Sequence, residues 1–362
     1  MVTTHIKHVL IAAGGTGGHV YPALAVADYL REQGVKVTWV GTEKGLEHRV
    51  VPVNNIPLEL ISISGLRGKG ILNLIFVPMK LVFAITQTIK IFMRVKPDAV
   101  LGMGGFVSGP CGLVAYILRK PLYIHEQNAI PGLTNKVLRH LATTVMQAFP
   151  NSFKDKNIVT LGNPIRKEIS DVPEPQIRMA ERNDNIHVLI VGGSLGAQAL
   201  NENIPKALSE IANDLQVDVW HQTGKNKLES TLESYKKSKV EARVTEFIED
   251  MAEAYEWADL VICRAGALTI SELANAGVAA ILVPYPYAVD DHQTANARYL
   301  TSVNAAILIP QEQLVTKLKE ILTELLQAGR TKLIGMAKAA RVLSKPYATK
   351  DVAEICLGVS HG

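Results

Sequence analysis

The sequence predicts an α/β protein made of two doubly wound domains. Short apolar runs alternate with amphipathic stretches along the chain, and glycine-rich turns follow several of these runs. The motif "HVLIAAGGTGGHVYPAL" near the amino terminus is echoed by "HVLIVGGSLGAQAL" at 187–200, almost half of the 362-residue chain further on. Alternating strands and helices form parallel sheets with right-handed crossovers. We therefore expect two such sheets that bind ligands at the carboxyl ends of their strands, in domains facing each other across a cleft.

The first half opens with a buried strand at 9–12, a glycine turn, and a helix from Pro22 that ends before Gly34. Four of the six residues from Gly14 to His19 are glycine. Glycine permits positive φ and close approach to a ligand, and the N–H groups opening the next helix favour anions. A tight turn alone needs one or two glycines, so this turn predicts phosphate or sugar binding. G-x-G-x-x-G and Walker motifs are absent here, which disfavours NAD and P-loop nucleotides.

Further strands and glycine turns follow in both halves. In the first we expect strands at "VKVTWVG", "DAVLGMGGF" and "PLYIHE", and in the second at "VDVWHQTG", "RVTEFI", "DLVICRAG" and "AAILVPYP". A polar, proline-bearing linker is expected at 161–178. A helix is expected to start near Thr269, where the spacing of Thr269 and Glu272 fits a capping box. Glu272 has a second interpretation, as a carboxylate that accepts hydrogen bonds from ribose hydroxyls.

The composition excludes several classes of protein. The chain is 48% apolar and 20% charged, as globular α/β proteins are. Its three cysteines are isolated, which predicts neither a disulfide framework nor a metal site and favours a reducing compartment. The first strand begins within ten residues of Met1, so we expect no signal peptide. No run of 18 residues is apolar and uncharged, so we expect no transmembrane helix.

Positive charge gathers in the first half of the chain. Residues 60–150 contain ten lysines or arginines and two carboxylates, a balance of +8 against +4 for the whole chain. Such a domain attracts an anionic partner. The segment 67–96 is apolar, basic, free of acidic residues and poor in aromatics for base stacking, which disfavours nucleic acid. It fits a membrane-surface element, or equally a core helix with solvated lysines.

Polar residues after other strand ends remain open on the sequence alone. His125 and Glu126 either tie a loop together or act chemically, and Asn128 either makes a turn or holds a substrate hydroxyl. His292 with its two preceding aspartates matches no strong metal motif, and the chain has no Asp-x-Asp. We therefore expect no metal, with diphosphate charge met by helix N-termini and by Arg166.

Seven blocks carry a resemblance to a known family: "GGTGGHVYPALAVA", "GMGGFVSGP", "HEQNAIPGLTNK", "GNPIR", "GGSLGA", "TEFIEDM" and "CRAGALTISELA". Together they resemble the family-28 N-acetylglucosaminyltransferases of bacterial peptidoglycan synthesis, from about residue 8 to 340. The resemblance implies a GT-B fold of two Rossmann-like domains. It also implies inverting, metal-free and cofactor-free transfer of GlcNAc from UDP-GlcNAc to the C4 hydroxyl of MurNAc in undecaprenyl-pyrophosphoryl-MurNAc-pentapeptide (lipid I), giving lipid II. The family works peripherally at the cytoplasmic face of the inner membrane, an anionic surface, with cell-wall synthesis and division proteins as candidate partners.

The resemblance also implies domain limits and a substrate site. An acceptor and membrane domain spans 1–164, a UDP-GlcNAc domain spans 165–340, and a closing helix in 341–362 returns to the first domain. The implied substrate-binding residues are Thr16, Gly17, Gly18, Asn128, Arg166, Ser194, Ile248, Ala267, Leu268, Thr269, Ile270, Ser271, Glu272 and Gln293. Glu272 is implied to bind the ribose hydroxyls.

The expected catalytic base and the expected acceptor-binding residues lie in the first half of the chain. A helix N-terminus disfavours imidazolium, so we expect neutral His19 to act as general base, with Glu126 as the next candidate. The acceptor pyrophosphate is expected at Gly14, Gly15, Gly104 and Gly105. Phe106 departs from the family, which often has tyrosine there. The alternatives are another GT-B enzyme of UDP-sugars, such as an epimerase, or a non-catalytic UDP-sugar-binding protein.

Overall fold

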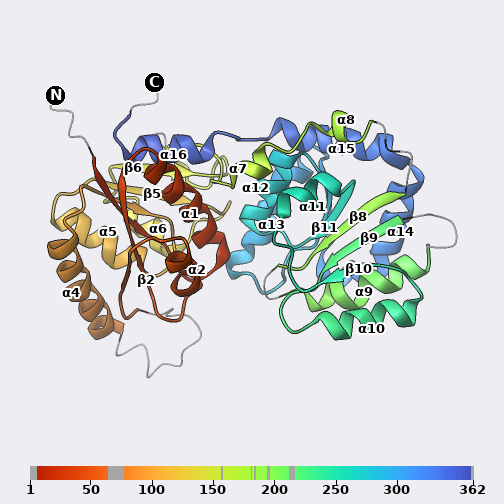
Figure 1. The fold of residues 1–362 in the computed structure, drawn as a ribbon, viewed down its shortest axis with the longest axis horizontal. Helices are drawn as coiled ribbons and strands as arrows, with labels where there is room; N and C mark the ends of the chain where they lie inside the picture. Colours follow the sequence, from red (N-terminus) through yellow and green to blue (C-terminus); the bar gives the residue numbers. More distant parts are fainter. Residues whose placement is uncertain are drawn as a thin grey trace. The chain divides into compact units, whose positions relative to one another are not determined.

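The computed structural model describes residues 6–63, 77–155, 158–180, 182, 185–193, 196–211 and 217–359. The chain divides into two compact units (Figure 1). Unit 1 comprises Met1–Arg166 with Tyr347–Gly362, and unit 2 comprises Lys167–Pro346.

Unit 1 is a parallel sheet covered by helices. Its described strands lie in the order β3-β2-β1-β4-β5-β6-β7, every pair being parallel. Its elements are β1 (His8–Ala12), α1 (Gly17–Glu32), β2 (Lys36–Gly41), α2 (Glu47–Val53), β3 (Leu58–Leu60), α4 (Val77–Val95), β4 (Ala99–Gly102), α5 (Ser108–Ile117), β5 (Leu122–Glu126), α6 (Leu133–Leu138), β6 (Thr144–Gln147), β7 (Ile158–Thr160) and α16 (Ala348–Cys356). The last helix, α16, packs beside α1 (Figure 1).

Unit 2 repeats the plan. Its described strands lie in the order β10-β9-β8-β11-β12-β13, again all parallel. Its elements are α7 (Lys167–Ser170), α8 (Pro175–Arg178), β8 (Ile186–Val191), α9 (Gln198–Ser209), β9 (Val217–Gln222), α10 (Leu228–Ser238), β10 (Arg243–Thr245), α11 (Met251–Trp257), β11 (Leu260–Cys263), α12 (Ala267–Ala276), β12 (Ala279–Leu282), η1 (Val289–Asp291), α13 (His292–Thr301), β13 (Ala306–Leu308), η2 (Gln311–Gln313), α14 (Leu314–Gln327) and α15 (Gly329–Val342).

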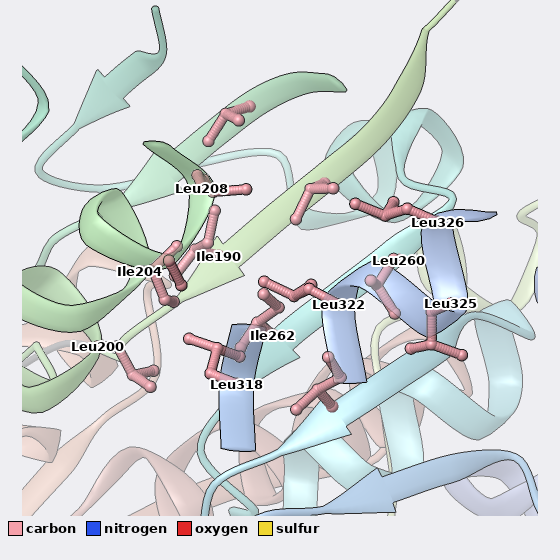
Figure 2. Packing of buried hydrophobic residues seen from close by; sticks show 14 of the residues in the cluster. Ile190, Leu200, Ile204, Leu208, Leu260, Ile262, Leu318, Leu322, Leu325 and Leu326 are labelled. Carbon is pink, nitrogen blue, oxygen red and sulfur yellow. The ribbon is translucent and has the colours of Figure 1, made fainter. Parts of the chain in front are cut away.

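The core of unit 2 shows why these residues form these elements. Figure 2 shows α9 and α14 packed beside strands β8 and β11 through apolar side chains. On the helices these side chains recur every three or four residues, which places them on one face. On the strands the apolar run is continuous, because a parallel sheet is buried on both faces. The labelled residues are Ile190, Leu200, Ile204, Leu208, Leu260, Ile262, Leu318, Leu322, Leu325 and Leu326.

One helix boundary differs from the sequence-based expectation. Helix α1 begins at Gly17, five residues before the expected start, so that Pro22 lies inside the helix. Proline lacks an N–H and removes one helical hydrogen bond, and local preference therefore predicts it in the first turn of a helix. The burial of Val20, Ala23, Val26, Ala27 and Leu30 favours the longer helix, because tertiary packing outweighs local preference.

Helix α4 combines two surfaces. Ala84, Thr88, Ile91 and Phe92 are buried in unit 1. Large apolar side chains elsewhere on the helix are exposed, namely Met79, Leu81, Val82, Phe83 and Met93. The sequence left a choice between a core helix and a surface element, and the described part of the segment has the features of both. Residues 67–76 lie outside the described residues. None of the helices described here is long and apolar enough to cross a membrane.

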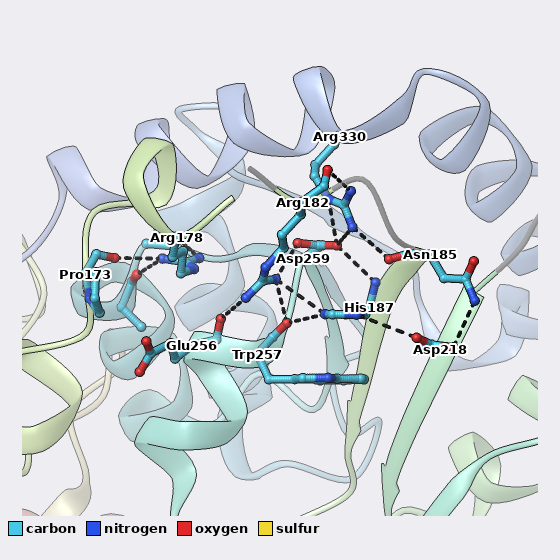
Figure 3. A network of polar contacts seen from close by, with 12 residues as sticks. Pro173, Arg178, Arg182, Asn185, His187, Asp218, Glu256, Trp257, Asp259 and Arg330 are labelled. Carbon is cyan, nitrogen blue, oxygen red and sulfur yellow. Dashed lines mark hydrogen bonds and ion pairs between the residues drawn. The ribbon is translucent and has the colours of Figure 1, made fainter. Parts of the chain in front are cut away.

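In each unit an aspartate just before one strand holds the start of the neighbouring strand. Asp98 precedes β4 and holds β1, and Asp259 precedes β11 and holds β8. Asp98 accepts a hydrogen bond from the backbone N–H of His8 at 3.0 Å, and Asp259 accepts one from His187 at 3.0 Å. Only Asp259 is completely buried, between Arg182 (2.8 Å) and Arg330 (2.9 Å). Figure 3 shows both guanidinium groups converging on its carboxylate. The two arginines also donate to backbone carbonyls, so the cluster ties three segments together.

Candidate active site

The glycine turns lie where the order of the strands reverses in each sheet. In unit 1 the neighbours β1 and β4 lead away to opposite edges, and in unit 2 β8 and β11 do so. Ligands of open α/β sheets bind at such switch points, outside the carboxyl ends of the strands. The turns at 13–16, 103–107 and 264–266 follow β1, β4 and β11 directly, and Gly192 and Gly193 follow β8.

In unit 1 two glycine turns interlock, backbone against backbone. Gly15, Gly104 and Gly105 have φ of +96°, +93° and +79°, a conformation that side chains disfavour. A Cβ on Gly105 would lie 2.4 Å from the carbonyl oxygen of Gly14. The turn after β4 is fixed by Ser108, whose Oγ donates to the Ala12 carbonyl at 2.8 Å and accepts from the Gly104 N–H at 3.1 Å.

This packing limits what the four glycines expected to bind the acceptor pyrophosphate can offer to a ligand. Gly14 and Gly104 are buried, and the N–H groups of Gly15 and Gly104 are already hydrogen-bonded within the protein. These groups therefore shape the turn and do not present an N–H to a ligand. The exposed residues of the first turn are Gly15 and Thr16, and Gly17 and Gly18, where α1 begins, are half-buried.

His19 lies half-buried in the first turn of α1, with its ring against the second glycine turn. A Cβ on Gly104 would lie 2.6 Å from Cδ2 and 2.9 Å from Nε2 of His19. The same Cβ would lie 3.3 Å from Oε1 of buried Gln127. Gly104 therefore makes room for the imidazole, and no other residue at 104 would fit without moving His19.

A buried carboxylate that the sequence analysis did not identify supports the first turn. Glu47 is 0% exposed and accepts from the Gly15 N–H (2.9 Å), the Thr42 N–H (2.9 Å) and the Thr42 hydroxyl (2.9 Å). It stands in the polar stretch "TEKGLEHR", which has no feature that marks a buried carboxylate. Only the fold brings it to Gly15, 32 residues earlier in the sequence.

His125 and Glu126 are both buried and both hydrogen-bonded within unit 1. His125 Nε2 donates to the Gly162 carbonyl (2.9 Å) and Nδ1 accepts from Gln127 (3.2 Å), which requires the neutral ring. Burial lowers the pKa of His125 to about 4. Glu126 accepts from the backbone N–H groups of Asn128 and Gly132 and from the side chains of Asn128 and Asn135. These contacts fit the interpretation in which the pair ties its loop together.

In unit 2 the corresponding turn is held by Gln222 at the end of β9. Its Oε1 accepts from the Gly193 N–H at 3.1 Å, and its Nε2 donates to the Gly193 carbonyl at 3.1 Å. Gly193 has φ of +81° and Gly196 has φ of +70°. Ser194, expected in the substrate site, lies outside the described residues. No motif in the sequence around Gln222 predicts this role.

The capping-box interpretation of Glu272 is wrong. Helix α12 begins at Ala267 after Gly266, so Thr269 is inside the helix and does not cap it. Glu272 is buried, and its Oε2 accepts from the Tyr255 hydroxyl at 2.9 Å. Of the expected residues 267–272, Leu268 and Thr269 are half-buried, whereas Ile270 is 0% exposed, backbone included.

The remaining expected residues lie on separate loops. Ile248 is half-buried between β10 and α11, and Gln293 accepts from the Tyr285 N–H at 2.9 Å, which fixes the loop after β12. Arg166 is exposed. It is the last residue of Met1–Arg166, the first of the two chain segments that form unit 1. Arg264, missed by the sequence analysis, donates to the Val283 carbonyl at 3.1 Å.

Among the described residues no group of three or more His, Cys, Asp or Glu is arranged to hold a metal ion.

Comparison with known proteins agrees with this arrangement. Residues 9–147 match the glycosyltransferase family 28 N-terminal domain, and residues 187–353 match the family 28 C-terminal domain. The curated UDP-N-acetylglucosamine–N-acetylmuramyl-(pentapeptide) pyrophosphoryl-undecaprenol N-acetylglucosamine transferase of Marinobacter nauticus is 49% identical over 360 residues, 98% of each chain. The protein of the same name from Nitrosococcus oceani is 50% identical over 355 residues, 98% of this chain and 99% of its own.

A solved structure gives the same result. The crystal structure of Acinetobacter baumannii MurG superposes with a TM-score of 0.84 at 42% identity, covering 97% of this chain and 99% of that one. Its similarity and the two family domains confirm the expected GT-B fold of two Rossmann-like domains. On its sequence and its fold together, the chain belongs to glycosyltransferase family 28.

Proposed function

We propose that this chain transfers GlcNAc from UDP-GlcNAc to the C4 hydroxyl of MurNAc in lipid I, giving lipid II with inversion at the anomeric carbon. The observation that carries the proposal is 49–50% identity over almost the whole chain to curated proteins named for this transfer. The glycine turns at the two switch points support it, since they follow the carboxyl ends of the strands, where open α/β sheets bind their ligands.

Unit 2 is the proposed donor domain. Ser194 and Arg166 contact the diphosphate and nucleotide, Ile248 meets uracil through its backbone, and residues 267–272 hold the nucleoside. Gln293 contacts the sugar. Apart from Arg166, these residues follow the carboxyl ends of β8, β10, β11 and β12, the edge at which such sheets bind nucleotides.

Unit 1 is the proposed acceptor domain. Thr16, Gly17 and Gly18 contact the GlcNAc and phosphate groups, and Asn128 binds a sugar hydroxyl. His19 accepts the proton of the MurNAc C4 hydroxyl while that oxygen attacks the anomeric carbon and UDP leaves with the bonding electron pair. Glu126 is the weaker candidate for the base, because its oxygens already accept hydrogen bonds from its own loop.

The function is tested by incubating the protein with radiolabelled UDP-GlcNAc and membranes or vesicles that contain lipid I. The proposal requires label in a lipid-extractable product that forms only with lipid I. Conversion of the free UDP-sugar without lipid I would identify an epimerase. Binding of UDP-GlcNAc with neither reaction would identify a non-catalytic sensor.

Replacing Glu272 with alanine is expected to remove recognition of the ribose. The variant should have a higher KM for UDP-GlcNAc and use the 2′-deoxy donor nearly as well as the normal one, because a hydrogen bond to a charged group contributes about 1.5–3 kcal/mol. Steady-state kinetics with both donors measures this. Tyr255→Phe, which keeps the carboxylate and removes only its partner, should retain most of the preference. Unchanged discrimination in Glu272→Ala would contradict the ribose role.

We further propose that unit 1 binds the anionic inner-membrane surface at the cytoplasmic face, where cell-wall synthesis and division proteins are its candidate partners. The support is helix α4, on which exposed Met79, Val82 and Phe83 stand beside exposed Lys80. Apolar side chains with flanking lysines suit an interfacial helix. Each basic residue near an anionic surface contributes about 1 kcal/mol, screened by salt.

Phe83→Glu is expected to abolish sedimentation with anionic liposomes while transfer to a short-chain, water-soluble lipid I analogue continues. The substitution adds a negative charge to a side chain that is 55% exposed. Val53→Glu on α2, where the side chain is 81% exposed, is the matched control and should bind liposomes normally. Binding by the native chain should weaken at high salt. Equal binding of the native chain to neutral liposomes would refute the electrostatic part of the proposal.

A further inference from the structure

Beside His19 lies a buried glutamine whose side-chain amide can point only one way. His125 Nε2 donates to the Gly162 carbonyl at 2.9 Å, so His125 Nδ1 is the nitrogen that accepts from Nε2 of Gln127, at 3.2 Å. Nε2 of Gln127 also donates to the His125 carbonyl at 3.2 Å, and the Gln127 carbonyl accepts from the Asn163 side chain at 3.1 Å. Because its nitrogen faces His125, the amide must turn its oxygen, Oε1, away from that residue.

The oxygen of this amide is buried without a donor. Gln127 is 1% exposed, and in the part of the chain that the structure describes no N–H or O–H group hydrogen-bonds to Oε1. Buried carbonyl oxygens normally have a donor, because an acceptor that loses its hydration and gains no partner destabilises the fold. The surroundings of Oε1 explain why the fold keeps it in this state.

Oε1 lies beside the ring of His19. A Cβ on Gly104 would lie 3.3 Å from Oε1 of Gln127 and 2.9 Å from Nε2 of His19. Both atoms therefore border the same small space, which stays open because residue 104 is glycine. Gln127 is too deeply buried to meet a substrate, whereas His19 is half-buried at the start of α1. The oxygen is thus placed to act on the imidazole.

A carbonyl oxygen at this place favours a positively charged ring. The oxygen is the negative end of the amide dipole, and its attraction for a cation is strong where water is excluded. The N-terminus of α1 acts in the opposite direction, since it disfavours imidazolium. Burial lowers the pKa of His125 to about 4, so that ring adds no charge near neutral pH. The ionisable groups on the segments around His19 are Tyr21, Glu43, Lys44, Glu47, His125 and Glu126.

We propose that Gln127 is a positioning residue of the transfer reaction, whose amide oxygen stabilises the imidazolium that His19 becomes when it takes the proton of the acceptor hydroxyl. Gln127 touches neither substrate and acts only through His19. A dipole that is fixed in advance toward a developing charge does not have to reorient during the reaction, and the hydrogen bonds to His125 fix this one. The inference rests on the proposed function, in which His19 is the general base.

The contact is tested without substrate, by following the ring signals of His19 by NMR as the pH is changed. His19→Ala identifies these signals. Gln127→Met removes the oxygen and should move the midpoint of the His19 titration to lower pH, because the cation loses a stabilising dipole. Gln127→Glu keeps an oxygen at this place and can add charge, so the midpoint should stay at its native pH or rise.

Both substitutions remove the N–H group that is given to His125, so the difference between them reports the oxygen alone. The titration of exposed His48 in α2 should stay unchanged and shows that unit 1 is native. Gln127→Leu takes the place of Gln127→Met if His48 is perturbed. An unchanged midpoint without the oxygen, or one lowered equally in Gln127→Glu, would overturn the proposal.

The effect on the reaction is tested by a double-mutant cycle in the transfer assay. Gln127→Met should lower kcat about tenfold, leave the KM for UDP-GlcNAc little changed, and move the acid limb of the kcat–pH profile to lower pH. In the His19→Ala background the same substitution should lower kcat no further, because Gln127 has nothing left to act on. Equal losses in the two backgrounds would refute the positioning role. Absence of transfer by the native chain, or a normal kcat in His19→Ala, would contradict the proposed function instead, and the NMR titration would still decide the contact.

Discussion

Asp259→Asn is expected to lower the free energy of unfolding of unit 2 by about 3–5 kcal/mol, the usual cost of removing one partner from a buried ion pair. The side chains of Arg182 and Arg330 are 18% and 15% exposed, and both donate to the carboxylate, which is 0% exposed. Asparagine keeps the shape but turns an N–H group toward two guanidinium groups, which are left without a counter-charge. The carboxylate also anchors the start of β8 through His187.

Hydrogen exchange resolved by segment is the suitable measurement, because two units need not unfold as one. Protection should fall in β8 and β11 and stay unchanged in β1 and β4. Asp98→Asn is the matched control, since Asp98 anchors β1 through the His8 N–H but is half-exposed. It should cost about 1–2 kcal/mol, because the Asp98 carboxylate accepts two backbone hydrogen bonds, from Lys7 (2.9 Å) and His8 (3.0 Å), and a hydrogen bond contributes about 1 kcal/mol. Equal losses in the two variants would show that the arginines contribute nothing.

His19→Ala is expected to lower kcat by about 10²–10⁴-fold, the usual contribution of a general base, with the KM for UDP-GlcNAc little changed. The reason is the position of the imidazole, in the first turn of α1 and against Gly104. The acid limb of the kcat–pH profile reports a group that must be deprotonated, and it should disappear in the variant.

His48→Ala, at an exposed histidine of α2 in the same unit, is the control and should leave kcat and its pH profile unchanged. A persistent acid limb in His19→Ala, or a loss confined to KM, would make His19 a binding residue. Glu126→Gln would then be the next variant. We expect that variant to lose stability as well, because Glu126 accepts four hydrogen bonds in its own loop.

The sequence by itself determined the two parallel-sheet halves, the positions of the glycine turns and the family. These features are readable because they depend on neighbouring residues: a strand buried on both faces has a continuous apolar run, and a left-handed backbone requires glycine. The echo of "HVLI" before each turn placed β1 and β8 correctly. The roles of the predicted substrate-binding residues remain predictions.

Tertiary structure alone decided which groups in the candidate site are available. The Gly15 N–H is taken by Glu47, and Gly193 by Gln222, across 32 and 29 residues of sequence. Packing also set the start of α1 at Gly17 and of α12 at Ala267, against local signals. The physical reason is common to all of these: a buried polar group must find a hydrogen-bond partner, and the partner is whichever group the folded chain brings within about 3 Å, at any distance along the sequence.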